Sequence, residues 1–272
     1  MKIVDCFIFY NELDMLKYRL SILNEYVDYF ILVESTHTHV GKEKQLFYNE
    51  NKELFKEFHS KIIHIIVDDF PFKFPNIDIA KSEQWKNENF QRNAIVRGLN
   101  QLSLLDDDII IISDLDEIPD PKILNNIIEN KLVINDVYKL EQDFYYYNLN
   151  SKMANTWYHS KIISYKKYIE LIIQHNINDI RWHIPVHNII RNAGWHLSYF
   201  GNSQFIQNKI QQFGHQEFNS EQYTNTDKIQ ERIDNCTDLY GRSGEQIIKI
   251  SIKDNQYLPP QYETYLNQFI LF

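Results

Sequence analysis

The chain has 272 residues, of which 43% are hydrophobic and 24% charged, and its formal net charge is −9. This length and apolar content suit one α/β domain with a large sheet, which we expect to span residues 1–272. The acidic balance argues against a nucleic-acid-binding face and against binding to an anionic membrane surface.

The sequence shows no sign of secretion or of a membrane anchor. Residues 1–10 are apolar but short, and they carry Asp5 and lack a small-residue cleavage site, so they favour a first strand over a signal peptide. No segment is long and apolar enough to span a bilayer. The two distant cysteines, Cys6 and Cys236, form no disulfide framework and fit a reducing compartment. We therefore expect a soluble or cytoplasmic protein.

The first part of the chain alternates between strand and helix patterns. An apolar strand pattern at 3–10 is followed by leucines at helical spacing from Leu13 to Leu23, with Asn11 as a candidate helix cap. The same reasoning predicts strands at 27–33, 61–67 and 109–112, helices at 44–59 and 82–105, and an irregular loop at 68–80. This order predicts an α/β fold with a mixed, mostly parallel sheet flanked by helices.

The second half has a different pattern. Aromatic-rich strands are expected within 133–148 and at 159–165, and a hairpin is expected between 186–191 and 195–200 through Asn192-Ala193-Gly194. Residues 203–213 and 227–239 have helical patterns. No repeat, low-complexity linker or domain boundary interrupts the chain, so this half can shape a second substrate pocket within the same domain.

The most informative segment is Asp114-Leu115-Asp116, which directly follows a run of four isoleucines. Such a run predicts a strand buried on both faces. Residues two apart in an extended chain point to the same side, and ligands of open α/β sheets bind beyond the carboxyl ends of strands. Two carboxylates aimed at one point repel each other, and a hard divalent cation relieves that repulsion. We therefore predict a site for Mn²⁺ or Mg²⁺ that holds a diphosphate.

A structural interpretation of the same segment stays open. Aspartates after strands are common because they favour turns and helix N-caps. Here Asp120 can cap a helix that starts near Pro121.

Other candidate site residues are scattered along the chain, and each also has a purely structural interpretation. Glu34, at the end of the second strand, can accept hydrogen bonds from a ribose or base, and Arg92 can reach a phosphate or sugar. His196 is a candidate third metal ligand, with His183 and His187 as competitors. Lys209 can neutralise a departing diphosphate, and Glu217 can accept a proton.

Several common catalytic motifs are absent from the sequence. There is no Gly-x-x-x-x-Gly-Lys phosphate loop, Gly-x-Gly-x-x-Gly turn, Cys-x-x-Cys, His-Glu-x-x-His or Gly-x-Ser-x-Gly elbow. These absences weaken the ATPase, dehydrogenase, zinc-protease and esterase interpretations.

Taken together, four segments resemble glycosyltransferase family 17, the family of enzymes that add bisecting N-acetylglucosamine to N-glycans. They are residues 9–16, 27–35, 90–93 and 111–119, and the later Gly194-Trp195-His196-Leu197-Ser198 is also similar. The resemblance covers roughly residues 3–242. It implies a GT-A-type (Rossmann-like) fold, a nucleotide-sugar donor, a divalent metal and an inverting transfer.

The resemblance also implies that the metal and donor site includes Asp114 and Asp116. We expect a UDP-sugar donor, with Asn11, Glu34, Arg92, Asp114 and Lys209 on the donor side. Asp143 and Glu217 are the two candidate proton acceptors for the hydroxyl of a glycan acceptor. Animal members carry a membrane anchor and stem that this sequence lacks, so its acceptor and donor sugar can differ from theirs.

Two alternatives stay open. A metal-dependent phosphatase can use Asp114 as its nucleophile, although such enzymes usually carry Asp-x-Asp after the first strand. A catalytically silent carbohydrate-binding protein is the other, because 14% of the residues are aromatic and apolar rings commonly contact sugars.

Overall fold

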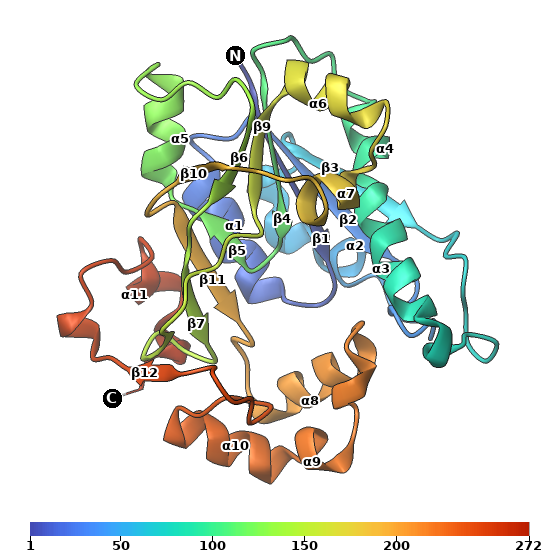
Figure 1. Ribbon diagram of the computed structural model, residues 1–272, viewed down its shortest axis with the longest axis vertical. Helices are drawn as coiled ribbons and strands as arrows, with labels where there is room; N and C mark the ends of the chain where they lie inside the picture. The colour runs from blue at the N-terminus through green and yellow to red at the C-terminus, as the bar shows by residue number, and fades with distance from the viewer. Residues whose placement is uncertain (272) are drawn as a thin grey trace.

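The computed structural model describes residues 1–271, which are built around a large sheet of seven strands (Figure 1). Four parallel strands form one side of this sheet, in the spatial order β4-β1-β2-β3. They are β1 (Ile3–Phe9), β2 (Tyr29–Ser35), β3 (Ile62–Val67) and β4 (Ile109–Asp114). All four strands predicted for the first part of the chain are confirmed.

The other side of the large sheet is mixed. Strand β9 (Lys161–Ser164) runs antiparallel to β4 and to β6 (Val137–Leu140), and β10 (Asn188–Ile190) pairs in parallel with β6 at the edge. Four of the six strand pairs are therefore parallel. The predicted α/β fold with a mixed, mostly parallel sheet is confirmed.

A second, smaller sheet lies beside the large one and has the order β12-β8-β7-β11-β5 (Figure 1). Its strands are β5 (Glu117–Pro119), β7 (Asp143–Tyr146), β8 (Ser151–Met153), β11 (Gly194–Ser198) and β12 (Ile247–Lys249). The predicted hairpin at 186–200 is wrong, because β10 belongs to the large sheet and β11 to the small one. Gly194, with φ of +136°, lies where the chain changes sheets, and a Cβ there would sit 2.0 Å from the carbonyl oxygen of Ile118.

Helices cover both faces of the large sheet, and others pack against the small one. The longer ones are α1 (Leu13–Leu23), α3 (Glu83–Asn93), α5 (Pro121–Ile128), α6 (Tyr165–Ile172), α8 (Ser203–Gln212) and α10 (Thr226–Asn235). The shorter ones are α2 (Phe47–Asn51), α4 (Ile95–Leu99), α7 (Ile177–Trp182), α9 (Glu221–Thr224) and α11 (Tyr262–Tyr265). Short 3₁₀ helices lie at Lys52–Phe58, Ile79–Lys81, Gln216–Phe218, Ile252–Asp254 and Asn267–Phe269.

Three helix predictions differ in detail from the structure. The helix expected at 82–105 is divided at Ala94 into α3 and α4, and the one expected at 44–59 begins at Phe47 and tightens into a 3₁₀ helix. Asn11 does not cap the first helix, because Glu12 occupies the N-cap position of α1 and makes no capping hydrogen bond with its side chain. The cap predicted at Asp120 is confirmed, since its side chain accepts a hydrogen bond from the amide of Lys122.

The isoleucine run of β4 shows how the core is divided. Ile109 and Ile111 pack in the cluster that contains α1 and α5, whereas Ile110 and Ile112 pack on the other face with α4, α6 and α7. All four are at most 2% exposed, which confirms that the strand is buried on both faces. A third cluster joins α8 and α10 to the small sheet.

Over residues 1–271, no helix combines the length and apolar character that crossing a bilayer requires. Cys6 and Cys236 are both free and buried, as a chain without a disulfide framework predicts.

Candidate active site

The segment Asp114-Leu115-Asp116-Glu117, here called the acidic turn, lies where the two sheets meet. Asp114 is the last residue of β4 in the large sheet, and Glu117 is the first residue of β5 in the small one. The turn between them, together with the carboxyl ends of β1 and β2, forms the floor of a cavity of about 580 Å³. Pockets for small ligands usually fall between about 300 and 1,000 Å³. The cavity is therefore of ligand size, at the edge of the sheet where a ligand was expected.

Arg19 holds the acidic turn from the core side. Its Nη1 atom donates hydrogen bonds to the backbone carbonyls of Asp114 (2.8 Å), Leu115 (2.9 Å) and Glu117 (3.0 Å). Its Nε and Nη2 atoms pair with both oxygens of Asp5 at 2.8 and 2.6 Å. Arg19 and Asp5 are 0% exposed, so the carbonyls of the turn are satisfied by a buried guanidinium rather than by water.

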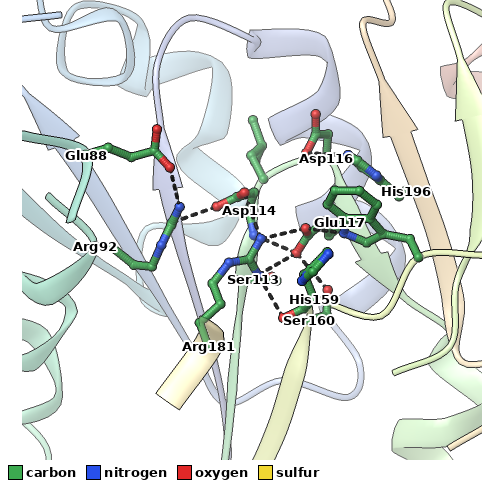
Figure 2. A network of polar contacts seen from close by, with 12 residues as sticks. Glu88, Arg92, Ser113, Asp114, Asp116, Glu117, His159, Ser160, Arg181 and His196 are labelled. Carbon is green, nitrogen blue, oxygen red and sulfur yellow. Dashed lines mark hydrogen bonds and ion pairs between the residues drawn. The ribbon is translucent and has the colours of Figure 1, made fainter. Parts of the chain in front are cut away.

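Asp114 is clamped by two other buried arginines (Figure 2). One carboxylate oxygen accepts a hydrogen bond from Arg92 Nη1 at 2.9 Å, and the other accepts one from Arg181 Nη2 at 2.8 Å. Arg92 also donates to Glu88 at 2.8 Å. Both oxygens of Asp114 therefore face guanidinium groups, although the carboxylate is 30% exposed at the cavity.

Glu117 completes this network below the cavity floor. It is fully buried and accepts hydrogen bonds from Arg181, Ser160 and the indole of Trp157. Burial alone would raise the pKa of Glu117, but the charge and hydrogen bonds of Arg181 hold it well below its ordinary value. Glu117 is therefore ionised and acts as the counter-ion of Arg181.

Asp116 points toward a different set of partners. Its two oxygens lie 3.6 Å from His196 Nε2 and 3.3 Å from Lys209 Nζ, and Lys209 also lies 3.2 Å from Glu12. Burial would raise the pKa of Asp116, but the charges of Lys209 and His196 keep it well below its ordinary value. Burial would lower the pKa of Lys209, but Asp116 and Glu12 outweigh burial and raise it. The cavity thus holds an ionised carboxylate beside a charged amine.

The three predicted metal ligands are not equivalent. Asp116 and His196 face each other, whereas both oxygens of Asp114 are already engaged by arginines. Within residues 1–271, no group of three or more His, Cys, Asp and Glu side chains is arranged to hold a metal ion. Asp116 and His196 still suit a cation that takes its remaining ligands from phosphate and water, as Mg²⁺ often does. The metal itself remains a prediction.

Of the predicted donor-side residues, Asp114 and Lys209 line the cavity, whereas Glu34, Arg92 and Asn11 do not. Glu34 accepts hydrogen bonds from the amide of Tyr48, in the first turn of α2, and from the ring of His64. Its carboxylate is therefore used within the fold, which corrects the expectation that it meets a ribose or base. Arg92 acts on the cavity only through Asp114 and Glu88.

The two predicted proton acceptors lie outside the cavity, so this part of the sequence analysis is corrected. Asp143 is on β7 and pairs with Lys152 at 2.5 Å, on the side of the strand opposite Phe144 and His196. Glu217 is 56% exposed and pairs with His215. A proton acceptor has to be sought among the carboxylates that line the cavity.

Aromatic rings form one wall of the cavity. Three of the four tryptophans of the chain line it, namely Trp85, Trp157 and Trp182. Successive rings from His196 through Trp157 and His159 to Trp182 lie 4.3, 4.4 and 4.2 Å apart between centroids. This wall runs from the ring beside Asp116 to a tryptophan that is 41% exposed, and such apolar faces suit the CH groups of a sugar.

Acid should weaken the fold through His159 in this wall. Burial lowers the pKa of His159 to about 4, against an opposing effect of Glu117. An unfolded histidine titrates near 6.5, so between about pH 6.5 and 4 the unfolded chain binds a proton that the folded chain does not. Stability is therefore lost as the pH falls through that window. His159→Phe should reduce the change in unfolding free energy with pH in this window, as measured by urea unfolding. The same change at the exposed His187 should not reduce it. An equal pH dependence in the two variants would show that His159 is not the group responsible.

Comparison with known proteins identifies the chain as a glycosyltransferase. It belongs to glycosyltransferase family 17, whose family model matches residues 1–249. The sequence resemblance to that family is therefore confirmed, and the acidic turn, the cavity and the aromatic wall all lie within the matched residues.

Individual relatives match over shorter stretches. The β-1,4-mannosyl-glycoprotein 4-β-N-acetylglucosaminyltransferases of Homo sapiens and Mus musculus are 30% and 29% identical over 113 residues. These residues are 40% of this chain but only 20% of each relative. Among solved structures, 4-diphosphocytidyl-2C-methyl-D-erythritol synthase of Anaerococcus prevotii is similar, with 9% identity, a TM-score of 0.40, and coverage of 75% of this chain and 93% of that one.

Proposed function

We propose that this protein is a metal-dependent, inverting glycosyltransferase of GT-A type. It moves a sugar, N-acetylglucosamine-like by its relatives, from a UDP-sugar to a hydroxyl of a glycan acceptor. The observation that carries the proposal is the grouping of Asp116, His196 and Lys209 at one end of a ligand-sized cavity with an aromatic wall. Carboxylate, imidazole and ammonium together suit a diphosphate and its cation, and the aromatic rings suit a sugar.

In this proposal Asp116 and His196 hold the metal, and the donor supplies further ligands. The bound metal would act as a Lewis acid that lowers the charge on the departing diphosphate. Asp114 has a different role, since Arg92 and Arg181 hold both of its oxygens. We infer that this clamp fixes the backbone from which Asp116 projects.

Lys209 is the residue best placed to meet the leaving group. Its ammonium is shared between Asp116 and Glu12, so it remains charged. When a diphosphate approaches, the same ammonium can turn toward a phosphate oxygen without leaving Asp116 unpaired, because the cation would then neutralise Asp116. The aromatic wall keeps water away from the reacting sugar, which limits hydrolysis of the donor.

A thermal-shift panel tests this function directly. Nucleoside diphosphates and nucleotide sugars should raise the melting temperature in the presence of Mn²⁺ but not in chelator, since ligands that bind the folded state stabilise it. We expect UDP and UDP-N-acetylglucosamine to give the largest shifts. Shifts with simple sugars alone would favour a silent carbohydrate-binding protein, and release of phosphate from simple esters would favour a phosphatase.

A further inference from the structure

Glu88 and His39 face each other at the rim of the same cavity. Both line it, and their side chains are 15% and 17% exposed. Glu88 Oε2 lies 3.5 Å from His39 Nδ1, while Glu88 Oε1 accepts a hydrogen bond from Arg92 at 2.8 Å. One oxygen of Glu88 is thus held by an arginine, and the other is directed at an imidazole nitrogen.

The position of the His39 proton follows from the neighbouring Gln91. The amide nitrogen of Gln91 donates to the backbone carbonyls of Phe9 (3.3 Å) and Val33 (2.9 Å), which can only accept. The amide oxygen of Gln91 must therefore be the atom that faces His39 Nε2 at 2.9 Å. Because that oxygen also only accepts, Nε2 of His39 carries the hydrogen, and Nδ1 of the neutral ring carries a lone pair.

Two lone-pair atoms therefore face each other, and a proton between them would satisfy both. Arg92 donates to the other oxygen of Glu88 at 2.8 Å, and this guanidinium favours the ionised form of the carboxylate, so Glu88 is able to accept a proton. We propose that Glu88 and His39 form the proton-accepting pair for the acceptor hydroxyl, an inference that rests on the proposed glycosyl transfer.

The other carboxylates that line the cavity already have partners. Asp116 lies between Lys209 and His196, and Glu12 pairs with Lys209. Asp114 has an arginine on each oxygen. Within the described part of the chain, Glu88 is therefore the cavity carboxylate whose second oxygen faces a lone pair instead of a cation.

Glu88 and Trp85 lie next to each other in the lining of the cavity. Gly214 packs against both side chains, since a Cβ there would lie 3.0 Å from Glu88 Oε2 and 2.8 Å from the ring of Trp85. Trp85 also lines the cavity, with the ring of His215 edge-on at 4.5 Å. A sugar packed against Trp85 therefore lies beside the carboxylate that is to receive its proton.

The step balances without any further reagent. The acceptor O–H bond breaks, and its proton goes to Glu88 Oε2, where His39 Nδ1 shares it. The acceptor oxygen forms a bond to the anomeric carbon with its electron pair. The bond from that carbon to the phosphate oxygen breaks, and its electrons leave with the nucleoside diphosphate, whose charge Lys209 meets.

Replacement of Glu88 tests the pair. Glu88→Gln keeps an acceptor for Arg92 but cannot take a proton, so kcat for transfer should fall by about 10²–10⁴-fold. Donor affinity should stay within about twofold of the wild-type value, as measured by calorimetry with UDP-N-acetylglucosamine and Mn²⁺. His39→Gln should cause a smaller loss. Glu170→Gln, the same change on exposed helix α6, should leave kcat unchanged.

Azide separates a catalytic role from a structural one. This anion attacks without losing a proton, so it should restore sugar release to Glu88→Ala and give the glycosyl azide, but it should not accelerate the wild type.

Nitrogen-15 NMR should show His39 protonated on Nε2. An Nδ1-protonated ring, or full transfer by Glu88→Gln, would overturn the pair alone. A wild type that transfers sugar from no nucleotide donor would overturn the proposed function and the pair together.

Discussion

Asp116→Ala should abolish sugar transfer while the protein stays folded. Asp116 is the carboxylate that faces both His196 and Lys209, and its loss would remove the main anionic ligand of the proposed cation. A cation that stabilises the leaving group is worth several kcal/mol, so we expect kcat/KM to fall by on the order of 10³-fold or more. Lys209 keeps Glu12 as its partner, so the melting temperature should change little.

The matched control for this variant lies at the other end of the same strand. Asp107 is exposed in the turn before β4, and Asp107→Ala should transfer at the wild-type rate. Donor binding should also lose its dependence on Mn²⁺ in Asp116→Ala but not in the control. Full transfer by Asp116→Ala in the presence of chelator would refute the metal assignment.

Arg19→Met should cost the fold about 3–5 kcal/mol of unfolding free energy, which is typical of a buried ion pair that loses one partner. The variant leaves Asp5 buried without its counter-ion and leaves three carbonyls of the acidic turn without a donor. Chemical denaturation measures the loss as a shift of the midpoint. Because the turn carries Asp116, donor affinity should fall as well.

A surface ion pair made by another residue of α1 provides the comparison. Lys17 pairs with Glu57, and their side chains are 35% and 59% exposed, so Lys17→Met should cost no more than about 1 kcal/mol. The double variant Asp5→Leu/Arg19→Met should lose less than Arg19→Met alone, because it removes the orphaned charge. Equal losses in the surface and buried variants would show that Arg19 does not hold the turn.

Periodicity was sufficient for the large sheet but not for the small one. The first four strands are predominantly apolar, and Ile109 to Ile112 alternate between the two core clusters, as a doubly covered strand must. The strands of the small sheet have three to five residues each. Whether β11 pairs with β10 or with β5 depends on the backbone path at Gly194, which local pattern does not encode.

The site was predictable where residues lie close in sequence. Asp114 and Asp116 both line the cavity beyond the carboxyl end of β4, as one strand and one turn predict, but their carboxylates face different partners and not one point. A signal for Arg19 also existed, since a charged residue on the leucine stripe of a helix requires a buried partner, and Asp5 in the first strand supplies it. Arg181 and His39 carried no such signal, because their roles depend on contacts with Glu117 and Glu88 that are 64 and 49 residues away in the sequence.

The passage of the chain between the two sheets limits how this enzyme can respond to substrates. The chain changes sheets five times, at β4–β5, β5–β6, β6–β7, β8–β9 and β10–β11. Because five connections join the two sheets, we expect the floor with Asp116 to move little relative to either sheet. In a glycosyltransferase of the proposed kind, acceptor preference can then diverge by substitutions at the rim, where Trp85 lies near the start of α3 and Trp182 at the end of α7, while the chemistry of the floor stays intact.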